Sequence, residues 1–167
     1  MPNISYEGKT IDFKDIFYPY AKVREGYRTQ MYKDILGKDT IGIGHLVTGK
    51  EPFPITAATV LTDAQVRMLF DMDYVRLNIE GYMSELAAKG YSYNMLLGAG
   101  HFIWMHGDAE YKTSRLRSGL LAKSWTPAAL HDYLLKNWDI RNQRLQKKNK
   151  ENFDLAFSPT PWKPPFP

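Results

Sequence analysis

The sequence contains no cysteine, which excludes both a disulfide framework and a cysteine-ligated metal site. It also contains no apolar run near the roughly 18 residues that a membrane-spanning helix needs. The first residues, MPNISYEGKTIDFKDIF, do not place a basic region before an apolar one, as a signal peptide does. We therefore expect no signal peptide, no transmembrane segment and no stable membrane insertion.

The chain has the length of one domain at 167 residues, with room for two lobes. Its net charge of +4 favours an anionic partner, such as nucleic acid, a membrane surface or the acidic polymer of a bacterial wall. Five basic residues lie in RNQRLQKKNK, residues 141–150, without the interleaved aromatics typical of nucleic-acid binding. We interpret this stretch as a solvated helix face and expect no nucleic-acid partner.

The four histidines do not form a metal-binding pattern. His101 and His106 are five residues apart, and Asp108 is the one carboxylate near them at ligand spacing. We expect no metal and no cofactor.

Hydrophobic periodicity predicts a mostly helical chain with one hairpin near its start. Pro19 suits the first turn of a helix, and Val23, Tyr27 and Met31 continue a helical stripe. From Tyr32 the period changes to two, with a glycine turn between two short strands. TDAQ at residues 62–65 is a capping box that opens a long helix through Leu77. Further helices are predicted over residues 93–105, 114–121, 127–138 and 140 to about 156.

Composition suggests two terminal segments outside this body. Residues 1–19 are predicted to be a leader that packs on the body, residues 20–156. Residues 157–167, here called the C-terminal arm, hold five of the ten prolines and cannot form a helix or an interior strand. The arm either docks on a partner chain or wraps its own domain.

Three residues around the hairpin could carry chemistry together. Glu25 and Asp34 would lie about 180° apart on one continuous helix, but the change from helix to hairpin can bring them together. A hairpin centred on Gly37 makes Asp34 and Thr40 cross-strand partners, with Cβ atoms roughly 5 Å apart. Beyond them the glycines at positions 42 and 44 leave an open floor on the same face.

Two carboxylates and a hydroxyl are suited to cleavage of a glycosidic bond. Glu25 is the candidate acid and Asp34 the candidate partner. Burial would raise the pKa of Glu25, whereas an arginine beside it would lower that pKa. The spacing alone is weak evidence, since it arises by chance in roughly a few per cent of chains of this size.

The flanking residues strengthen this hypothesis. The segment REGYRTQMYKDILGKDTIGIGHLVTG, residues 24–49, closely resembles the catalytic segment of phage-type lysozymes, glycoside hydrolase family 24, the T-even phage lysozyme group. The resemblance implies an α+β, bilobed, lysozyme-like fold, with a small hairpin lobe at about residues 32–60 and a larger helical lobe at about 62–156. It also implies a catalytic trio in which Glu25 is the general acid, while Asp34 and Thr40 hold the attacking water.

Other positions take roles only through the resemblance. His45 matches a structural histidine, with Asp73 as its partner. Gly44, Leu46 and Trp104 match cleft positions, and Ser114 and Asp132 match further ones through a stretch where residues must be inserted. An arginine that pairs with Glu25 is expected from the basic helix, with Arg144 the first choice and Arg141 the second.

The resemblance predicts a muramidase that hydrolyses the β-1,4 bond between N-acetylmuramic acid and N-acetylglucosamine of bacterial peptidoglycan. A phage endolysin, held in the host cytoplasm before release to the periplasm, is the first expectation. The alternatives are a virion or tail-associated lysozyme, bound to a virion protein through its arm, and an inactive wall-binding homologue. A lytic transglycosylase would instead release anhydro products. The intact trio argues against an inactive homologue, and Asp34 and Thr40 favour hydrolysis.

Overall fold

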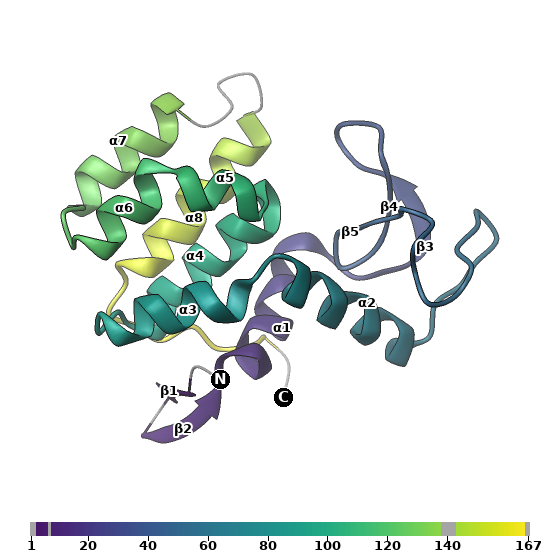
Figure 1. Ribbon diagram of the computed structural model, residues 1–167, viewed down its shortest axis with the longest axis horizontal. Coiled ribbons are helices and arrows are strands. Elements are labelled where there is room, and N and C mark those ends of the chain that lie inside the picture. The colour runs from purple at the N-terminus through teal and green to yellow at the C-terminus, as the bar shows by residue number, and fades with distance from the viewer. Residues whose placement is uncertain (1–2, 7, 138–142, 166–167) are drawn as a thin grey trace.

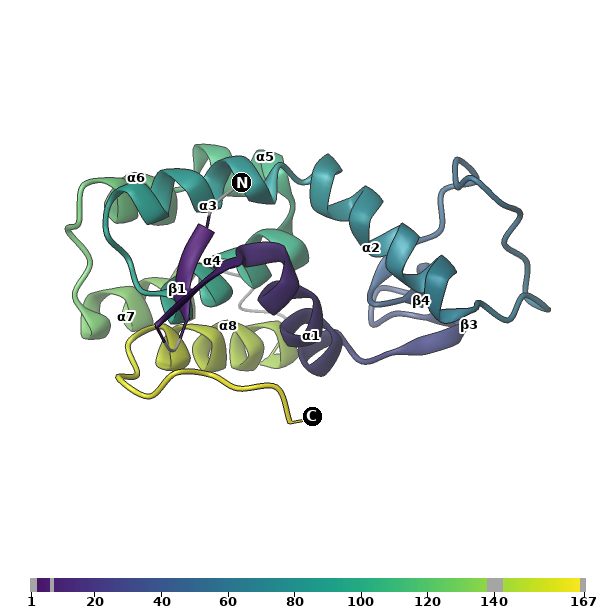
Figure 2. The ribbon, with the colours of Figure 1, turned by 90° about the horizontal axis from the view of Figure 1, so that it is seen from below.

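The computed structural model describes residues 3–6, 8–137 and 143–165. It has two lobes joined by a long helix, α2 (Asp63–Arg76), as Figures 1 and 2 show. The small lobe is an antiparallel sheet in the order β3-β4-β5. Its strands are β3 (Arg28–Lys33), β4 (Asp39–Gly42) and β5 (His45–Leu46). The fold is therefore α+β, with a small sheet lobe and a larger helical lobe, as predicted.

The chain begins with a hairpin of β1 (Asn3–Tyr6) and β2 (Lys9–Asp12), followed by α1 (Phe13–Glu25). The prediction that this helix starts at Pro19 is wrong, because the helix begins at Phe13, six residues earlier, where Asp12 caps it, and Pro19 lies inside it. Phe13, Phe17 and Tyr20 are buried along its inner face, and this packing outweighs the backbone hydrogen bond that an interior proline removes. Tyr27 and Met31 lie beyond the helix end, so the predicted stripe through them is wrong as well.

The capping box of α2 is present as predicted. The backbone N–H of Thr62 donates to Gln65 Oε1 over 2.9 Å, and that of Gln65 donates to Thr62 Oγ1 over 3.2 Å. Two helices lie where none was predicted, α3 (Ile79–Ala88) and α5 (Asp108–Thr113), the second of them in a segment interpreted as a break.

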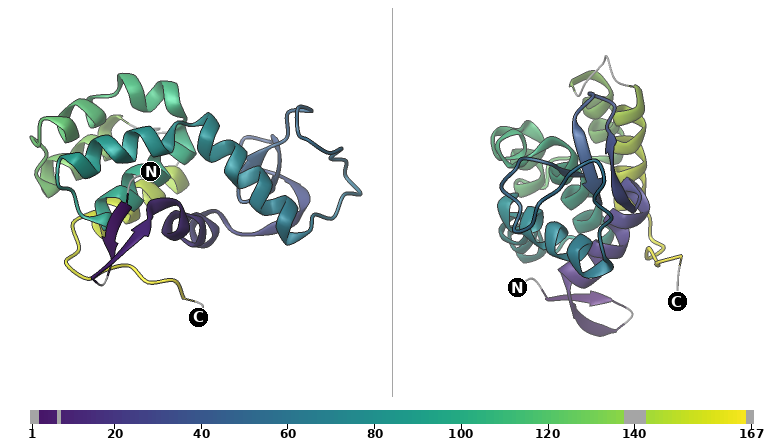
Figure 3. Two further views of the ribbon diagram at one scale, coloured as in Figure 1. Left: turned by 60° about the horizontal axis from the view of Figure 1, so that its bottom comes forward. Right: turned by 90° about the vertical axis from the view of Figure 1, so that its right-hand side faces the viewer.

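The helical lobe is built around α4 (Tyr93–His106), which is buried over most of its length. Helix α8 (Gln143–Ala156) runs beside it, and α6 (Arg115–Leu121) and α7 (Pro127–Asn137) complete the lobe, as Figure 3 shows from two further sides. A Cβ at Gly98 would lie 2.7 Å from the backbone oxygen of Asn152, so a side chain there cannot be accommodated without moving α8. This close approach places one face of α8 against the end of α1 that carries Glu25.

The described part of the C-terminal arm packs on its own domain. The side chain of Asn94 donates to the backbone oxygens of Ser158 and Thr160, over 3.2 and 2.8 Å, and accepts from Trp162 N over 3.0 Å. The Trp162 ring meets Tyr20 edge-on at 5.1 Å. Of the two uses expected for the arm, the structure contains the contact with its own domain. Among the described helices, none combines the length and the apolar character needed to cross a bilayer.

Candidate active site

A pocket of about 400 Å³ opens beside the hairpin, where the end of α1 meets α4 and α8. Five residues expected at the site line it together: Glu25, Asp34, Thr40, Gly44 and Trp104. They come from α1, the β3–β4 hairpin, the turn after β4 and α4. The tertiary structure thus brings the trio and two of the expected cleft residues together around one pocket.

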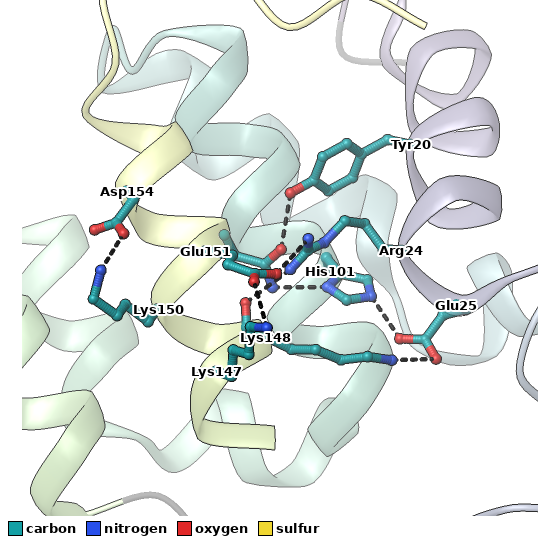
Figure 4. A network of polar contacts seen from close by, with 10 residues as sticks. Tyr20, Arg24, Glu25, His101, Lys147, Lys148, Lys150, Glu151 and Asp154 are labelled. Atoms are coloured by element: carbon teal, nitrogen blue, oxygen red, sulfur yellow. Dashed lines mark hydrogen bonds and ion pairs between the residues drawn. The ribbon is translucent and has the colours of Figure 1, made fainter. Parts of the chain in front are cut away.

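Glu25 is the last residue of α1, and its side chain is 15% exposed. Its two oxygens have different partners. Oε1 lies 2.6 Å from Nε2 of the fully buried His101, and Oε2 accepts from Lys148 Nζ over 3.1 Å (Figure 4). Burial by itself would raise the pKa of Glu25, but the hydrogen bonds from His101 and Lys148 and the positive charge of Lys148 outweigh it and hold that pKa well below its ordinary value. The carboxylate is therefore ionised in the unliganded protein.

The cation expected beside Glu25 comes from the predicted helix but at a different position. Lys148 supplies it, one helical turn beyond the first choice, Arg144, and residues four apart share a helix face. The side chain of Arg144 and all of Arg141 lie outside the described residues, so their part of the prediction stays untested. The sequence-based prediction considered only arginine for this role and therefore did not include Lys148.

The hairpin register differs from the prediction. Tyr32 pairs with Thr40, and Asp34 N donates to Lys38 O over 2.9 Å, so the centre is Leu36 rather than Gly37. Asp34 and Thr40 are diagonal neighbours on one face, and their direct pairing was predicted wrongly. The reason is a three-residue loop whose last residue, Gly37, has φ 76°, a common hairpin geometry with glycine in the left-handed region.

Asp34 also holds this loop in place. Its Oδ1 accepts from the backbone N–H groups of Leu36 and Lys38, over 2.8 and 2.9 Å. The hydroxyl of the buried Thr40 donates to Lys38 O over 3.1 Å. A hydroxyl that donates its proton to the backbone presents lone pairs to other donors, such as a water molecule in the pocket.

The floor of the pocket is Gly44. Its φ of 70° favours glycine, and a Cβ there would lie 3.4 Å from Trp104 Nε1 and 3.5 Å from Glu25 Oε2. Gly42, expected to extend the floor, faces Val66 of α2 instead. Trp104 donates from Nε1 to Ile43 O over 3.2 Å, so the hairpin holds this ring at the pocket wall.

The expected histidine pair is present behind the hairpin. Nδ1 of the buried His45 lies 2.8 Å from Asp73 Oδ2, and its Nε2 lies 3.3 Å from Glu51 Oε1, a partner that the sequence did not indicate. Burial lowers the pKa of His45, but the two carboxylates outweigh it and the net pKa is raised. This arrangement ties the hairpin and its following loop to α2.

Three expected cleft residues do not line the pocket that contains Glu25. Leu46 is 39% exposed and borders a separate hollow with Met68 and Met72 of α2. Ser114 caps α6, accepting from Arg117 N over 3.1 Å. Asp132 is exposed and pairs with Lys136. Ser114 and Asp132 follow α5, a helix that was not predicted. Their match to the family's cleft positions was therefore made without the correct helix boundaries.

Some residues of the site were missed by sequence reasoning. His101 was considered only as a metal ligand, although a polar residue inside the apolar run LLGAGHFIW needs a buried hydrogen-bond partner. Arg28, Tyr32 and Met105 also line the pocket. Among the residues that the structure describes, no three His, Asp or Glu side chains gather in a way that could hold a metal ion.

Comparison with known proteins relates the chain to one family. The family model described as Phage lysozyme matches residues 22–150. A mutant of P22 lysozyme is similar in structure with a TM-score of 0.65 and 23% identity, covering 95% of this chain and 100% of that one. No curated protein matches the sequence.

Two further solved structures share the fold. An endolysin from Escherichia coli O157:H7 phage FAHEc1 has a TM-score of 0.65 at 16% identity, covering 92% of this chain and 98% of that one. The muramidase domain of SpmX from Asticaccaulis excentricus has a TM-score of 0.63 at 17% identity, covering 89% and 99%. The similarity to these solved structures shows the fold, and the match to the family model shows family membership. The chain therefore belongs to the phage lysozyme family, and at the level of that family it is a lysozyme-type glycosidase.

Proposed function

We propose that the protein is a peptidoglycan muramidase that hydrolyses the β-1,4 bond between N-acetylmuramic acid and N-acetylglucosamine. The observation that supports this best is the convergence of Glu25, Asp34 and Thr40 on one pocket at the junction of the lobes. In this reaction Glu25 donates a proton to the glycosidic oxygen. Asp34 and Thr40 position the water that attacks the sugar from the other side.

The ionised state of Glu25 must change before it can act as an acid. Lys148 occupies Oε2, the oxygen on the Gly44 side, in the unliganded protein. A sugar that enters the pocket excludes water from Glu25 and competes with Lys148 for Oε2. Both effects raise the pKa of Glu25, so the acid becomes protonated only when substrate is bound.

Clearing of purified peptidoglycan tests the proposal. We expect the Glu25→Gln variant, which keeps the shape but cannot donate a carboxylic proton, to lose at least about 100-fold in rate. Asp132→Asn, at an exposed ion pair away from the pocket, is the control and should act like the wild type. If the wild type and Glu25→Gln clear the wall at the same slow rate, the enzymatic proposal is wrong.

Mass spectrometry of the digest separates hydrolysis from a lytic transglycosylase reaction. Hydrolysis adds water and leaves reducing muramic ends, whereas a transglycosylase leaves anhydro ends. Asp34→Asn keeps the Oδ1 acceptor that holds the loop but removes the charge, and Asp34→Ala removes both. We expect both variants to lose activity and only Asp34→Ala to lose stability.

For the biological setting we propose a free endolysin rather than a virion component. The support is that the described part of the C-terminal arm packs on its own domain, where it contacts Asn94 and Tyr20. Mass spectrometry of purified phage particles should then not find the protein, whereas its presence in stoichiometric amounts would favour a virion-associated lysozyme.

A further inference from the structure

Glu25 is attached to a line of hydrogen bonds that leads away from the pocket into the helical lobe (Figure 4). Its other members are Tyr20, Asn152 and His101. The Tyr20 hydroxyl donates to Asn152 Oδ1 over 2.8 Å, and Asn152 Nδ2 lies 2.7 Å from His101 Nδ1. Nε2 of His101 in turn lies 2.6 Å from Glu25 Oε1. Asn152 and His101 are both 0% exposed, so bulk water does not compete for these bonds.

The order of donors determines which nitrogen of His101 carries the proton. Because Oδ1 of Asn152 accepts from Tyr20, the amide NH₂ is the end that faces the ring. An amide NH₂ only donates, so Nδ1 must be the unprotonated nitrogen. Nε2 therefore carries the ring proton and donates it to Oε1 of Glu25.

The charges around His101 agree with a neutral ring. Burial lowers its pKa, the Glu25 carboxylate raises it, and the positive charges of Arg24 on α1 and Lys148 on α8 lower it again. The net pKa is below the ordinary value. From the hairpin side, Arg28 and Asp34 line the pocket that Glu25 faces.

We propose that His101, held in this tautomer by Asn152 and Tyr20, is a positioning residue that occupies Oε1 of Glu25 and restricts the transferable proton to Oε2. Oε2 is the oxygen beside Gly44 on the pocket floor and beside Lys148. The inference rests on the function proposed above, because it assigns a role within that reaction. In the chemical step the proton leaves Oε2 for the glycosidic oxygen, and the His101 N–H stabilises the carboxylate charge that returns.

The first test observes the tautomer directly and needs no activity. In ¹⁵N NMR spectra of the full chain, assigned with the variant His101→Gln, we expect a pyridine-type Nδ1 and a pyrrole-type Nε2. These signals should not titrate around the ordinary histidine pKa of about 6.5. The variant Asn152→Asp places an acceptor at Nδ1, and we expect it to reverse the tautomer or to charge the ring. A wild-type ring that is charged at neutral pH, or protonated on Nδ1, would overturn the inference.

The second test uses the pH dependence of Glu25. His101→Gln keeps a donor toward Oε1, whereas His101→Leu keeps volume and removes the donor. We expect His101→Leu to lose about 10- to 100-fold in kcat and to move the alkaline limb of the kcat/KM profile to higher pH, since the ionised form loses a donor. His101→Gln should recover the limb position and part of the rate. A uniform loss in both variants with an unmoved limb would mean that His101 only fills space.

Failure of this inference is distinguishable from failure of the proposed function. A ¹³C titration of the Glu25 carboxyl in the wild type, His101→Gln and His101→Leu reports the same pKa order without any substrate. If the protein does not cleave peptidoglycan, the muramidase proposal fails while the tautomer and the titration still test the role of His101. If it cleaves peptidoglycan but the titration does not distinguish the two variants, only the role of His101 is wrong.

Discussion

At the scale of single residues, Lys148 places a formal positive charge beside Glu25 and acts with the His101 hydrogen bond to lower the pKa of that carboxyl. Its ammonium group is 3.1 Å from Glu25 Oε2 and its side chain is only 19% exposed, so water screens the pair weakly. Glu25 also ends a helix, and the negative end of the helix dipole opposes a carboxylate there. Lys148 therefore counteracts both the burial and the dipole.

Lys148→Met should raise the pKa of Glu25, because it removes the nearby positive charge and keeps the aliphatic stem. A general acid acts in its protonated form, so we expect the alkaline limb of the kcat/KM profile to move to higher pH, by about one unit or more. Lys147→Met, one residue away at an exposed position, is the matched control and should leave the profile unchanged. An unshifted limb in Lys148→Met would contradict the role given to this lysine.

At the scale of elements, the approach of α4 and α8 places the supporting residues of the site. Lys148 and Asn152 are four apart and share the face of α8 that turns toward Glu25 and His101. The two helices can come this close because Gly98 has no side chain. A small change in the separation of α4 and α8 therefore alters the contacts that Lys148 and His101 make with Glu25.

Gly98→Ala tests this coupling. Its Cβ would lie 2.7 Å from backbone atoms of α8, which cannot rotate away, so we expect a loss of about 1–3 kcal/mol in the free energy of unfolding, with reduced activity. Gly81→Ala in α3 is the control, because its Cβ would meet only the end of the Asn78 side chain. Urea denaturation should find the control unchanged or more stable, since alanine favours helices. Equal stabilities for the two variants would contradict the proposed packing constraint.

At the scale of the whole molecule, the C-terminal arm is connected to the site through Tyr20. Trp162 packs on Tyr20, which begins the line of hydrogen bonds through Asn152 to Glu25. We expect Trp162→Ala to lower the free energy of unfolding by about 1–2 kcal/mol, because an aromatic pair and buried area are lost. The exposed Phe157→Ala is the control.

The activity of these two variants shows whether the arm only stabilises the fold or also positions Tyr20. If the arm supports Tyr20, Trp162→Ala should lower kcat at a temperature where the protein is still folded, and Phe157→Ala should not. Thermal denaturation followed by circular dichroism, with clearing assays at the same temperatures, measures both quantities. Wild-type kcat in Trp162→Ala would mean that the arm contributes stability alone.

Stability should depend on pH in two opposite ways. Hydrogen bonds from the backbone and side chain of Thr48 lower the pKa of Glu51 to about 2 against the effect of burial, and the pKa of Glu25 is also lowered. Such groups contribute stability that is present above their unfolded value of 4.5 and is lost as the pH falls toward about 2. His45 has a raised pKa, so its contribution is complete below 6.5 and is lost as the pH rises through the folded value.

The contributions of Glu25, Glu51 and His45 should therefore be complete together between about pH 4.5 and 6.5. Urea denaturation across the acid range should give a steeper loss for the wild type than for Glu51→Gln, which has no carboxylate to protonate. Glu110→Gln, another carboxylate replaced at an exposed position of α5, controls for the change in net charge. Identical slopes in the wild type and Glu51→Gln would show that Glu51 is not a source of the acid loss.

The sequence alone determined the features that depend on neighbours along the chain. The capping box of α2, most of the helices and the hairpin follow from spacing over a few residues, and residues 24–49 contain the candidate trio within one short segment. The start of α1 was predicted wrongly, because burial of Phe13 and Phe17 in the folded core outweighed the local signal of Pro19. Local signals are reliable only where tertiary packing does not oppose them.

Only the tertiary structure decided which groups support Glu25. Its partners His101 and Lys148 lie 76 and 123 residues away, and Asn152 lies 132 residues from Tyr20. No periodic pattern links residues so far apart, since their meeting depends on how closely α4 and α8 pack and on which helix face turns inward. The sequence thus indicated Glu25 as the candidate acid, whereas the fold decided its hydrogen-bond partners, its charge state and which of its oxygens lies beside Gly44 on the pocket floor.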